Sequence, residues 1–127
     1  MVKQKLPKLT VEDHLNNTPQ CIVKLFDALK IRILELGINN IQEKVTNPYI
    51  GYKFIGNKNK RSKLFVEVHL QQKKIELHLR PLEYDDMRVT KAPDTHRWTL
   101  NKLVDINNEA DLNYIMKFVE QSYKDFL

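Results

Sequence analysis

Two neighbouring segments of alternating side chains, residues 64–70 and 75–80, constrain the fold of this chain more than any other feature. Neighbouring side chains of a β-strand point to opposite faces, so each segment forms one apolar and one polar face. A hairpin that pairs Leu70 with Ile75 unites the two apolar faces, whereas a slip by one residue would expose them to water. The apolar face of this predicted hairpin contains Leu64, Val66, Val68, Leu70, Ile75, Leu77 and Leu79.

The polar face of the same hairpin places Glu67 opposite His78 and His69 opposite Glu76. Imidazole and carboxylate groups together suit Zn, Fe or Mn, and a histidine oriented by a glutamate suits a general base. Alternatively, cross-strand Glu–His pairs neutralise a half-exposed face, at about 0.2–1 kcal/mol each. Strong metal sites usually show helix or loop spacings that fix the ligands more rigidly. The sequence therefore favours paired surface charge, and we expect no metal and no cofactor.

The remaining periodicity predicts one α+β domain over residues 10–127. Thr10 and Asp13 indicate a capped helical turn, and Thr18-Pro19 indicates the start of a helix with an apolar stripe from Ile22 to Leu36. We expect Gly37 to end that helix in a left-handed cap. Further strands are expected at 49–55, 98–100 and 103–106, and a last helix after Asn108. The predicted fold is a two-layer sandwich: an antiparallel sheet of four or five strands, with an N-terminal and a C-terminal helix packed on one face.

Composition limits the class of protein. No apolar run approaches the ~20 residues that cross a bilayer, and the N-terminus lacks the apolar core of a signal peptide, which predicts a cytoplasmic protein and no membrane partner. Cys21 is the one cysteine and is expected to be buried, which excludes an internal disulfide. Residues 1–63 hold 12 basic and 5 acidic side chains and residues 64–127 hold 9 and 11, so the first half carries the positive charge.

Basic side chains gather between two predicted strands and in a flexible arm over residues 1–9. Lysines and arginines in such a connection contact phosphates and bind nucleic acid with little sequence preference. Tyr49, Tyr52 and Trp98 would stack on bases if exposed, although a lysine-rich connection also serves as a solvated edge that discourages aggregation. The predicted nucleic-acid contacts are Lys53, Lys58, Lys60, Arg61 and Lys63. The polar face beside them is expected to form a groove lined by Tyr52, Glu67, His69, Glu76, His78, Arg80, Arg97 and Trp98.

A series of short phrases resembles a prokaryotic family of domains of unknown function that is sometimes labelled "predicted transport protein". The resemblance covers roughly residues 9 to 125 and rests on residues 10–15, 25–29, 49–53, 65–68, 71–75, 85–86, 96–98, 111–114 and 121–123. Members often form the C-terminal part of larger chains, including restriction-type nucleases of the GmrSD sort, and the resemblance implies no established activity. After the acidic pair the family has proline, a basic residue and glycine, where this chain has Met87-Arg88-Val89.

The chain contains no catalytic motif of a known class. A phosphate-binding glycine loop, a Gly-x-Ser-x-Gly elbow and a His-Glu-x-x-His helix are all absent from the sequence. We therefore expect a non-catalytic recognition module, either part of a prokaryotic, defence-type protein or a stand-alone relative, that binds nucleic acid through the basic connection. The alternatives are a protein-interaction or oligomerisation domain, including a homodimer, and a metal-dependent enzyme that uses the Glu/His face.

Overall fold

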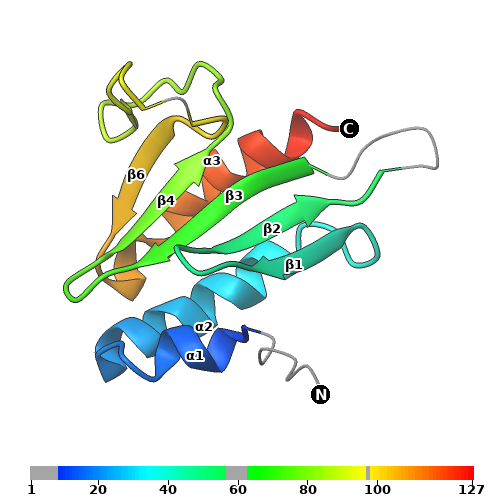
Figure 1. The fold of residues 1–127 in the computed structure, drawn as a ribbon. Coiled ribbons are helices and arrows are strands. Elements are labelled where there is room, and N and C mark those ends of the chain that lie inside the picture. Colours follow the sequence, from blue (N-terminus) through cyan, green and yellow to red (C-terminus); the bar gives the residue numbers. More distant parts are fainter. Residues whose placement is uncertain (1–8, 57–62, 97) are drawn as a thin grey trace, which may run out of the picture.

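The computed structural model describes residues 9–56, 63–96 and 98–127, and Figure 1 shows how they are arranged. The class is α+β, as the sequence predicts. In chain order the elements are α1 (Val11–Leu15), α2 (Gln20–Leu34), β1 (Ile41–Val45), β2 (Ile50–Phe54), β3 (Lys63–Leu70), β4 (Ile75–Leu79), β5 (Thr90–Lys91), β6 (Lys102–Ile106), a 3₁₀ turn (Glu109–Asp111) and α3 (Leu112–Lys124).

The strands form one antiparallel sheet of six strands in the order β1-β2-β3-β4-β6-β5, so the prediction of four or five strands is too low. β1 escapes prediction because Gln42, Glu43 and Lys44 fill its centre, as is common in strands at the edge of a sheet. β5 has two residues, too few for any periodicity. The strand predicted at 98–100 is wrong, because these residues form a bend before β6.

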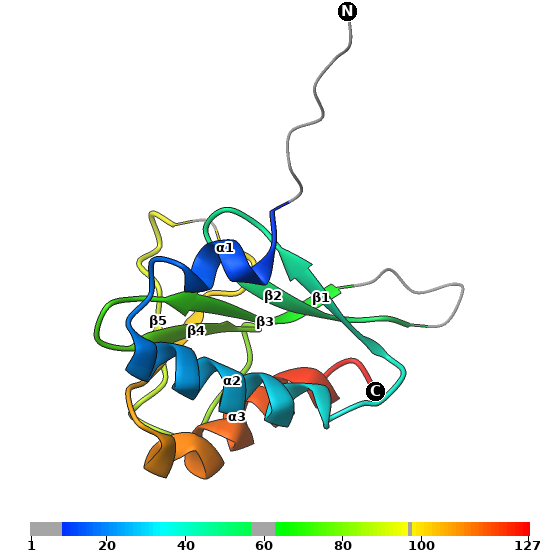
Figure 2. The ribbon, with the colours of Figure 1, turned by 90° about the horizontal axis from the view of Figure 1, so that it is seen from below.

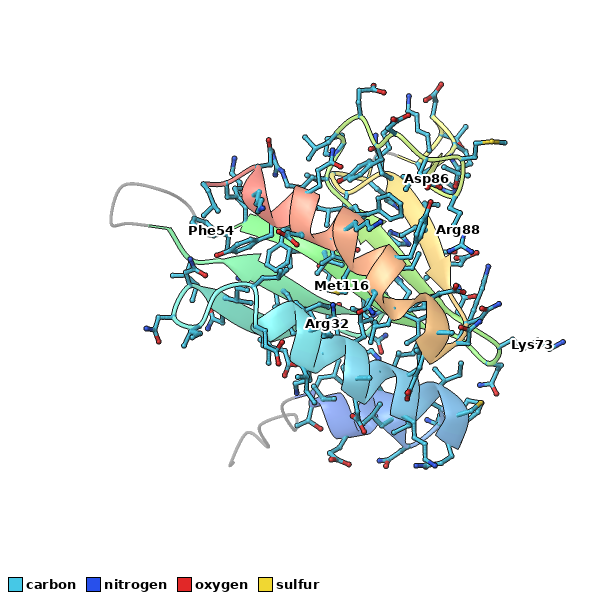
Figure 3. The ribbon with its side chains drawn as sticks, turned by 180° about the vertical axis from the view of Figure 1, so that it is seen from behind. Arg32, Phe54, Lys73, Asp86, Arg88 and Met116 are labelled. Atoms are coloured by element: carbon cyan, nitrogen blue, oxygen red, sulfur yellow. The ribbon has the colours of Figure 1, made fainter. Side chains whose placement is uncertain are left out.

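The helices α2 and α3 lie side by side and cover one face of the sheet, as predicted (Figure 2). Figure 3, which views the molecule from behind, shows both helices in front of the strands. The side chains that they bury against the sheet recur every three or four residues, which is the spacing that the sequence displays. These are Ile22, Leu25, Phe26, Leu29 and Ile33 of α2, and Leu112, Ile115, Met116, Phe118, Val119, Ser122 and Tyr123 of α3.

The hairpin of β3 and β4 has the predicted register. Leu70 pairs with Ile75, Glu67 with His78 and His69 with Glu76. The buried face of this hairpin rests on the helices, and its polar face is the one turned toward the viewer in Figure 1. Because the alternation of apolar side chains leaves one favourable register, the sequence was sufficient to fix it.

A β-bulge between β2 and β3 places Leu64 on the opposite face from the one that the sequence predicts. Tyr52 pairs with Val66 and Lys53 with Leu64, so Phe65 is an extra residue in β3. The Phe65 ring packs against an aromatic ring of α3 at a centroid distance of 5.2 Å. Leu64 consequently lines the polar face, and its predicted place on the apolar face is wrong, since one inserted residue inverts the alternation beyond it.

Two local predictions for α2 are also wrong. Gly37 does not adopt a left-handed conformation, and α2 ends at Leu34 with Glu35 still right-handed. Glycine is nevertheless required there, because a Cβ at this position would collide with Asn40 and Tyr123. Cys21 is exposed, because it lies on the outer side of the helix next to the buried stripe.

The segment between β4 and β6 passes around the end of the sheet and links its two faces. On the helix side, Gln121 of α3 donates a hydrogen bond to the backbone oxygen of Glu83 at 2.8 Å. On the other side, the Trp98 ring lies 5.0 Å from the ring of His78, centroid to centroid. This segment therefore closes one side of the polar face of the sheet.

A side chain of the acidic pair stabilises the turn within this segment. The carboxylate of Asp86 accepts a hydrogen bond from the backbone N–H of Arg88 at 2.7 Å, and Figure 3 labels both residues. Arg88 also lies over the ring of Tyr114, 4.8 Å from its centre. The departure at Met87-Arg88-Val89 is thus compatible with an ordered turn, because an aspartate side chain can bond the backbone two residues ahead.

Several predicted features lie outside the described residues: residues 1–8 of the basic arm, and Lys58, Lys60, Arg61 and Arg97. Among the helices that the structure describes, none combines the length and apolarity that crossing a membrane requires.

Candidate functional site

A pocket of about 830 Å³ opens on the face of the sheet that α2 and α3 leave uncovered. Its floor comes from the polar sides of β3 and β4, and its walls come from the residues that precede β2 and from the bend before β6. The lining residues are Pro48, Tyr49, Lys63, Leu64, Glu67, His69, Glu76, His78, Arg80, Pro81, Trp98, Thr99 and Leu100.

The four charged or polar residues of the floor form two Glu–His pairs within the strands. His69 Nε2 lies 3.2 Å from Glu67 Oε1, and His78 Nε2 lies 2.7 Å from Glu76 Oε1. The sequence predicts pairs across the strands, and the backbone register is indeed the predicted one. The two imidazole rings, however, stack on each other at a centroid distance of 3.8 Å. This stack directs each ring edge toward the glutamate of its own strand.

Aromatic rings flank the two histidines on both sides, tilted against the imidazole rings. Tyr49 lies 5.5 Å from His69, and Trp98 lies 5.0 Å from His78. Beyond Trp98, the ring of His96 is parallel to the indole within 11° at 4.4 Å. Trp98 is 44% exposed, so part of its ring remains accessible from solvent.

Burial and charge give the floor an acceptor character. His78 is 3% exposed, and its burial lowers the pKa of the imidazole although the hydrogen bond with Glu76 opposes this shift. Burial therefore favours the neutral form of His78, next to two carboxylates. Burial, and then the charge of Glu67, raises the pKa of the Tyr49 phenol. Negative charge is thus concentrated at the bottom of the pocket.

Positive charge lies at the rim. Lys63 is exposed and Arg80 closes the end of β4. The Arg80 Nε atom donates to Asp125 Oδ2 at 2.8 Å, and its guanidinium lies 4.2 Å above the ring of Phe126. This ion pair holds Arg80 in place and offsets part of its charge, which leaves Lys63 as the more available cation of the two.

A glycine in β2 permits the walls to close over the floor. A Cβ at Gly51 would lie 2.6 Å from Leu64 Cδ2 and 3.0 Å from Tyr49 Cε1. The first distance is too short for a real side chain and the second is tight, so Leu64 and Tyr49 pack directly on the glycine backbone. The bulge at Phe65 is what brings Leu64 to this face.

The structure brings together most residues of the predicted groove and rejects one of them. Six of the eight line the pocket: Glu67, His69, Glu76, His78, Arg80 and Trp98. Tyr52 does not, because it pairs with Val66 on the helix side, is fully buried and donates to Glu43 Oε2 at 2.8 Å. Among the predicted nucleic-acid contacts, Lys63 lines the pocket, and Lys53 faces the same side because it pairs directly with Leu64.

Some residues of the site could not be assigned from sequence. Leu64 reaches the pocket only through the bulge, and His96 joins it only because its segment returns to the sheet. Tyr49 is marked in the sequence as an aromatic residue before a strand, which is a signal for stacking but not for this position.

A family model described as "Domain of unknown function (DUF5655)" matches residues 11–125 of the chain. No curated protein matches the chain, and no solved structure does.

Proposed function

The chain belongs to the DUF5655 family of domains of unknown function, and from the geometry of its pocket we propose that it is a non-catalytic module that recognises single-stranded nucleic acid. The observation that carries this proposal is the combination of an exposed aromatic wall, an acidic floor and a basic rim in one pocket. One unstacked base enters the pocket, and the neighbouring phosphates lie on the rim.

The aromatic wall fits the flat face of a base. Trp98 is held in position by the parallel His96 ring and still exposes 44% of its surface. Stacking of a base on an aromatic side chain contributes about 1–3 kcal/mol and tolerates any base. Bases inside a duplex are already stacked, so this wall favours single strands.

The floor fits the edge of a base rather than a phosphate. The side chains of Glu67 and Glu76 are 16% and 24% exposed. Their carboxylate oxygens accept hydrogen bonds from the amino and imino groups of a base. The same carboxylates repel a phosphate from the bottom of the pocket. The phosphate is therefore placed at the rim, near Lys63 and Lys53.

Lys63 of the rim is the last residue of the most basic part of the sequence. Lys63 follows directly on Lys58, Lys60 and Arg61 in the chain. Because the pocket itself combines two carboxylates with two cations, these lysines and the arginine have to supply most of the electrostatic attraction for a polyanion.

Fluorescence anisotropy with a labelled single strand of about 12 nucleotides, and with the matching duplex, tests the proposal across a salt series. We expect tighter binding of the single strand, and a loss of about 10- to 100-fold in affinity for Trp98→Ala. Replacing both Lys53 and Lys63 by glutamine should reduce the slope of log K against log salt by about 1.4. Lys73→Gln, at the far turn of the hairpin (Figure 3), is the matched control.

Two outcomes contradict the proposal. Absence of binding at about 50 mM salt removes nucleic acid as the ligand. If Trp98→Ala leaves binding unaffected while the lysine variant changes the salt slope, nucleic acid binds outside the pocket.

The resemblance to domains at the C-terminus of restriction-type proteins supports a place for this module beside a nuclease, in a cytoplasmic prokaryotic defence protein. In that setting it would hold the strand that the partner domain acts on. Co-purification of the chain with nucleic acid, removed by nuclease treatment, is the corresponding observation in cells.

A second candidate is self-association through the edge strand β1. Its outer edge has no partner strand among the described residues, and unpaired strand edges accept a second chain. Sedimentation at high concentration decides between a monomer and a dimer, and Lys44→Pro should abolish a dimer that forms through this edge.

A further inference from the structure

We propose that Glu67, His69 and His78 bind one divalent transition-metal ion of the zinc class at the floor of the pocket. This site goes beyond nucleic-acid recognition and revises the expectation of paired surface charge. It rests on the positions of three ligand atoms and on the burial of one of them.

The three ligand atoms already lie at distances that suit one ion. All three are within 4.8 Å of one another. Glu67 Oε1 lies 3.2 Å from His69 Nε2 and 3.9 Å from His78 Nδ1. Ligands that are 2.0–2.2 Å from a tetrahedral ion are about 3.3–3.6 Å apart, so shifts of a few tenths of an ångström complete these two spacings.

His78 is prepared for a metal by its second nitrogen. Its Nε2 lies 2.7 Å from Glu76 Oε1, which makes Nε2–H the donor and leaves a lone pair on Nδ1. A carboxylate that accepts from a histidine on the side away from the ion is the usual outer partner of a metal ligand. The 3.9 Å between Nδ1 and Glu67 Oε1 is too long for a hydrogen bond, so this contact leaves the Nδ1 lone pair available to a metal.

A neutralised surface would not need this arrangement. An exposed Glu–His pair places both groups in water, whereas His78 is buried and its Nδ1 faces a carboxylate, which is an acceptor like itself. The two carboxylates of the floor balance the charge of a divalent ion.

The ligands lie on rigid elements, and one position stays open. The register of β3 and β4 is fixed by their buried face, so the Cα atoms of all three residues are held. Besides the small shifts in these spacings, binding requires that the His69 ring turn out of its stack on His78. Three protein ligands under a pocket leave the fourth position to water or to a ligand in the pocket.

Titration of the untagged, chelator-treated protein with Zn²⁺ in competition with a chromogenic chelator tests the site. We expect one equivalent to bind, with affinity reduced at least about 100-fold in the Glu67→Gln, His69→Ala double variant. Glu76→Gln should lower the affinity about 10- to 100-fold. His14→Gln, which removes a histidine of α1 that does not line the pocket, is the control and should bind as the wild type does.

A second readout is independent of affinity. Co²⁺ bound by two imidazoles and a carboxylate gives the intense visible absorption of a tetrahedral ion, and the double variant should lose it. Zinc should also raise the melting temperature of the wild type but not of the double variant. The two substituted residues are half-buried, so circular dichroism is used to check that the double variant folds.

The proposal is overturned if zinc binds with equal affinity to the wild type and to the double variant, or does not bind at all. Nucleic-acid binding is measured separately with a chelator present. Failure of the metal site and failure of nucleic-acid recognition are therefore distinguishable.

Discussion

Replacing Ser122 by alanine removes the hydroxyl through which α3 holds the two central strands of the sheet. Ser122 is fully buried, and its Oγ donates to the backbone oxygen of Phe65 at 2.5 Å. Ser122 Oγ also accepts a hydrogen bond from the backbone N–H of Arg80 at 3.2 Å. One side chain thus satisfies the bulge residue of β3 and the residue at the end of β4.

The expected cost follows from these two hydrogen bonds. A buried backbone group that loses its partner costs about 1–3 kcal/mol. The Phe65 carbonyl is enclosed beneath α3, so its loss of a partner should have this full cost. Arg80 is half-buried, so its backbone N–H can exchange the lost hydrogen bond for one to water. Serine and alanine have nearly the same volume, so little is lost in packing. We expect the free energy of unfolding to fall by about 1–3 kcal/mol, a large part of the 5–15 kcal/mol typical of a domain.

Urea unfolding at neutral pH, followed by circular dichroism, measures this difference. The slope of free energy against urea should be equal for the two proteins, so that the shift in midpoint reports stability. Thr95→Val, which removes an exposed hydroxyl, should stay within about 0.5 kcal/mol of the wild type. A change below about 0.5 kcal/mol for Ser122→Ala would refute the reasoning, because it would mean that both backbone groups find other partners.

Three further predictions concern glycines and pH. Gly51→Ala should displace Leu64 from the pocket wall and lower the free energy of unfolding by about 1–3 kcal/mol; an unchanged urea midpoint would contradict this. Gly37→Ala should break the contact with the Tyr123 hydroxyl and lower the melting temperature, and equal melting curves would argue against it. Burial raises the pKa of Tyr84 to about 12. Because an unfolded phenol ionises near pH 10, stability should fall from pH 10 to 12, and less steeply in Tyr84→Phe. Parallel curves for the two proteins would contradict this.

The helices and the central hairpin could be predicted because their signals are local. The stripe of α2 repeats at three- and four-residue spacing, and the capping box of Thr10 and Asp13 forms as the sequence predicts. The register of β3 and β4 follows from two short segments with one shared apolar face. In each case the free energy of burying one face selects the structure.

Other parts of the fold depend on contacts that the local pattern does not encode. Leu64 and Phe65 are both apolar, so the sequence allows either of them to face the core. Phe65 does so because its ring packs against the ring of Tyr123 in α3. β1 is polar because it lies at an edge, and the adjacent β2 is what makes it a strand. Tyr52 is assigned to the wrong face because the sequence does not show how β2 aligns with β3.

The sequence by itself determined that the glutamates and histidines of the hairpin share a face opposite the core. Alternation has a period of two, so burial of the apolar set leaves no other place for them. Only the tertiary structure decided that this face forms a pocket. The two histidines stack, the bulge turns Leu64 toward them, and the segment after β4 brings Trp98 over them from residues distant in the chain. A pocket forms between segments that are distant in the sequence, whereas a local sequence pattern specifies the structure of one segment only.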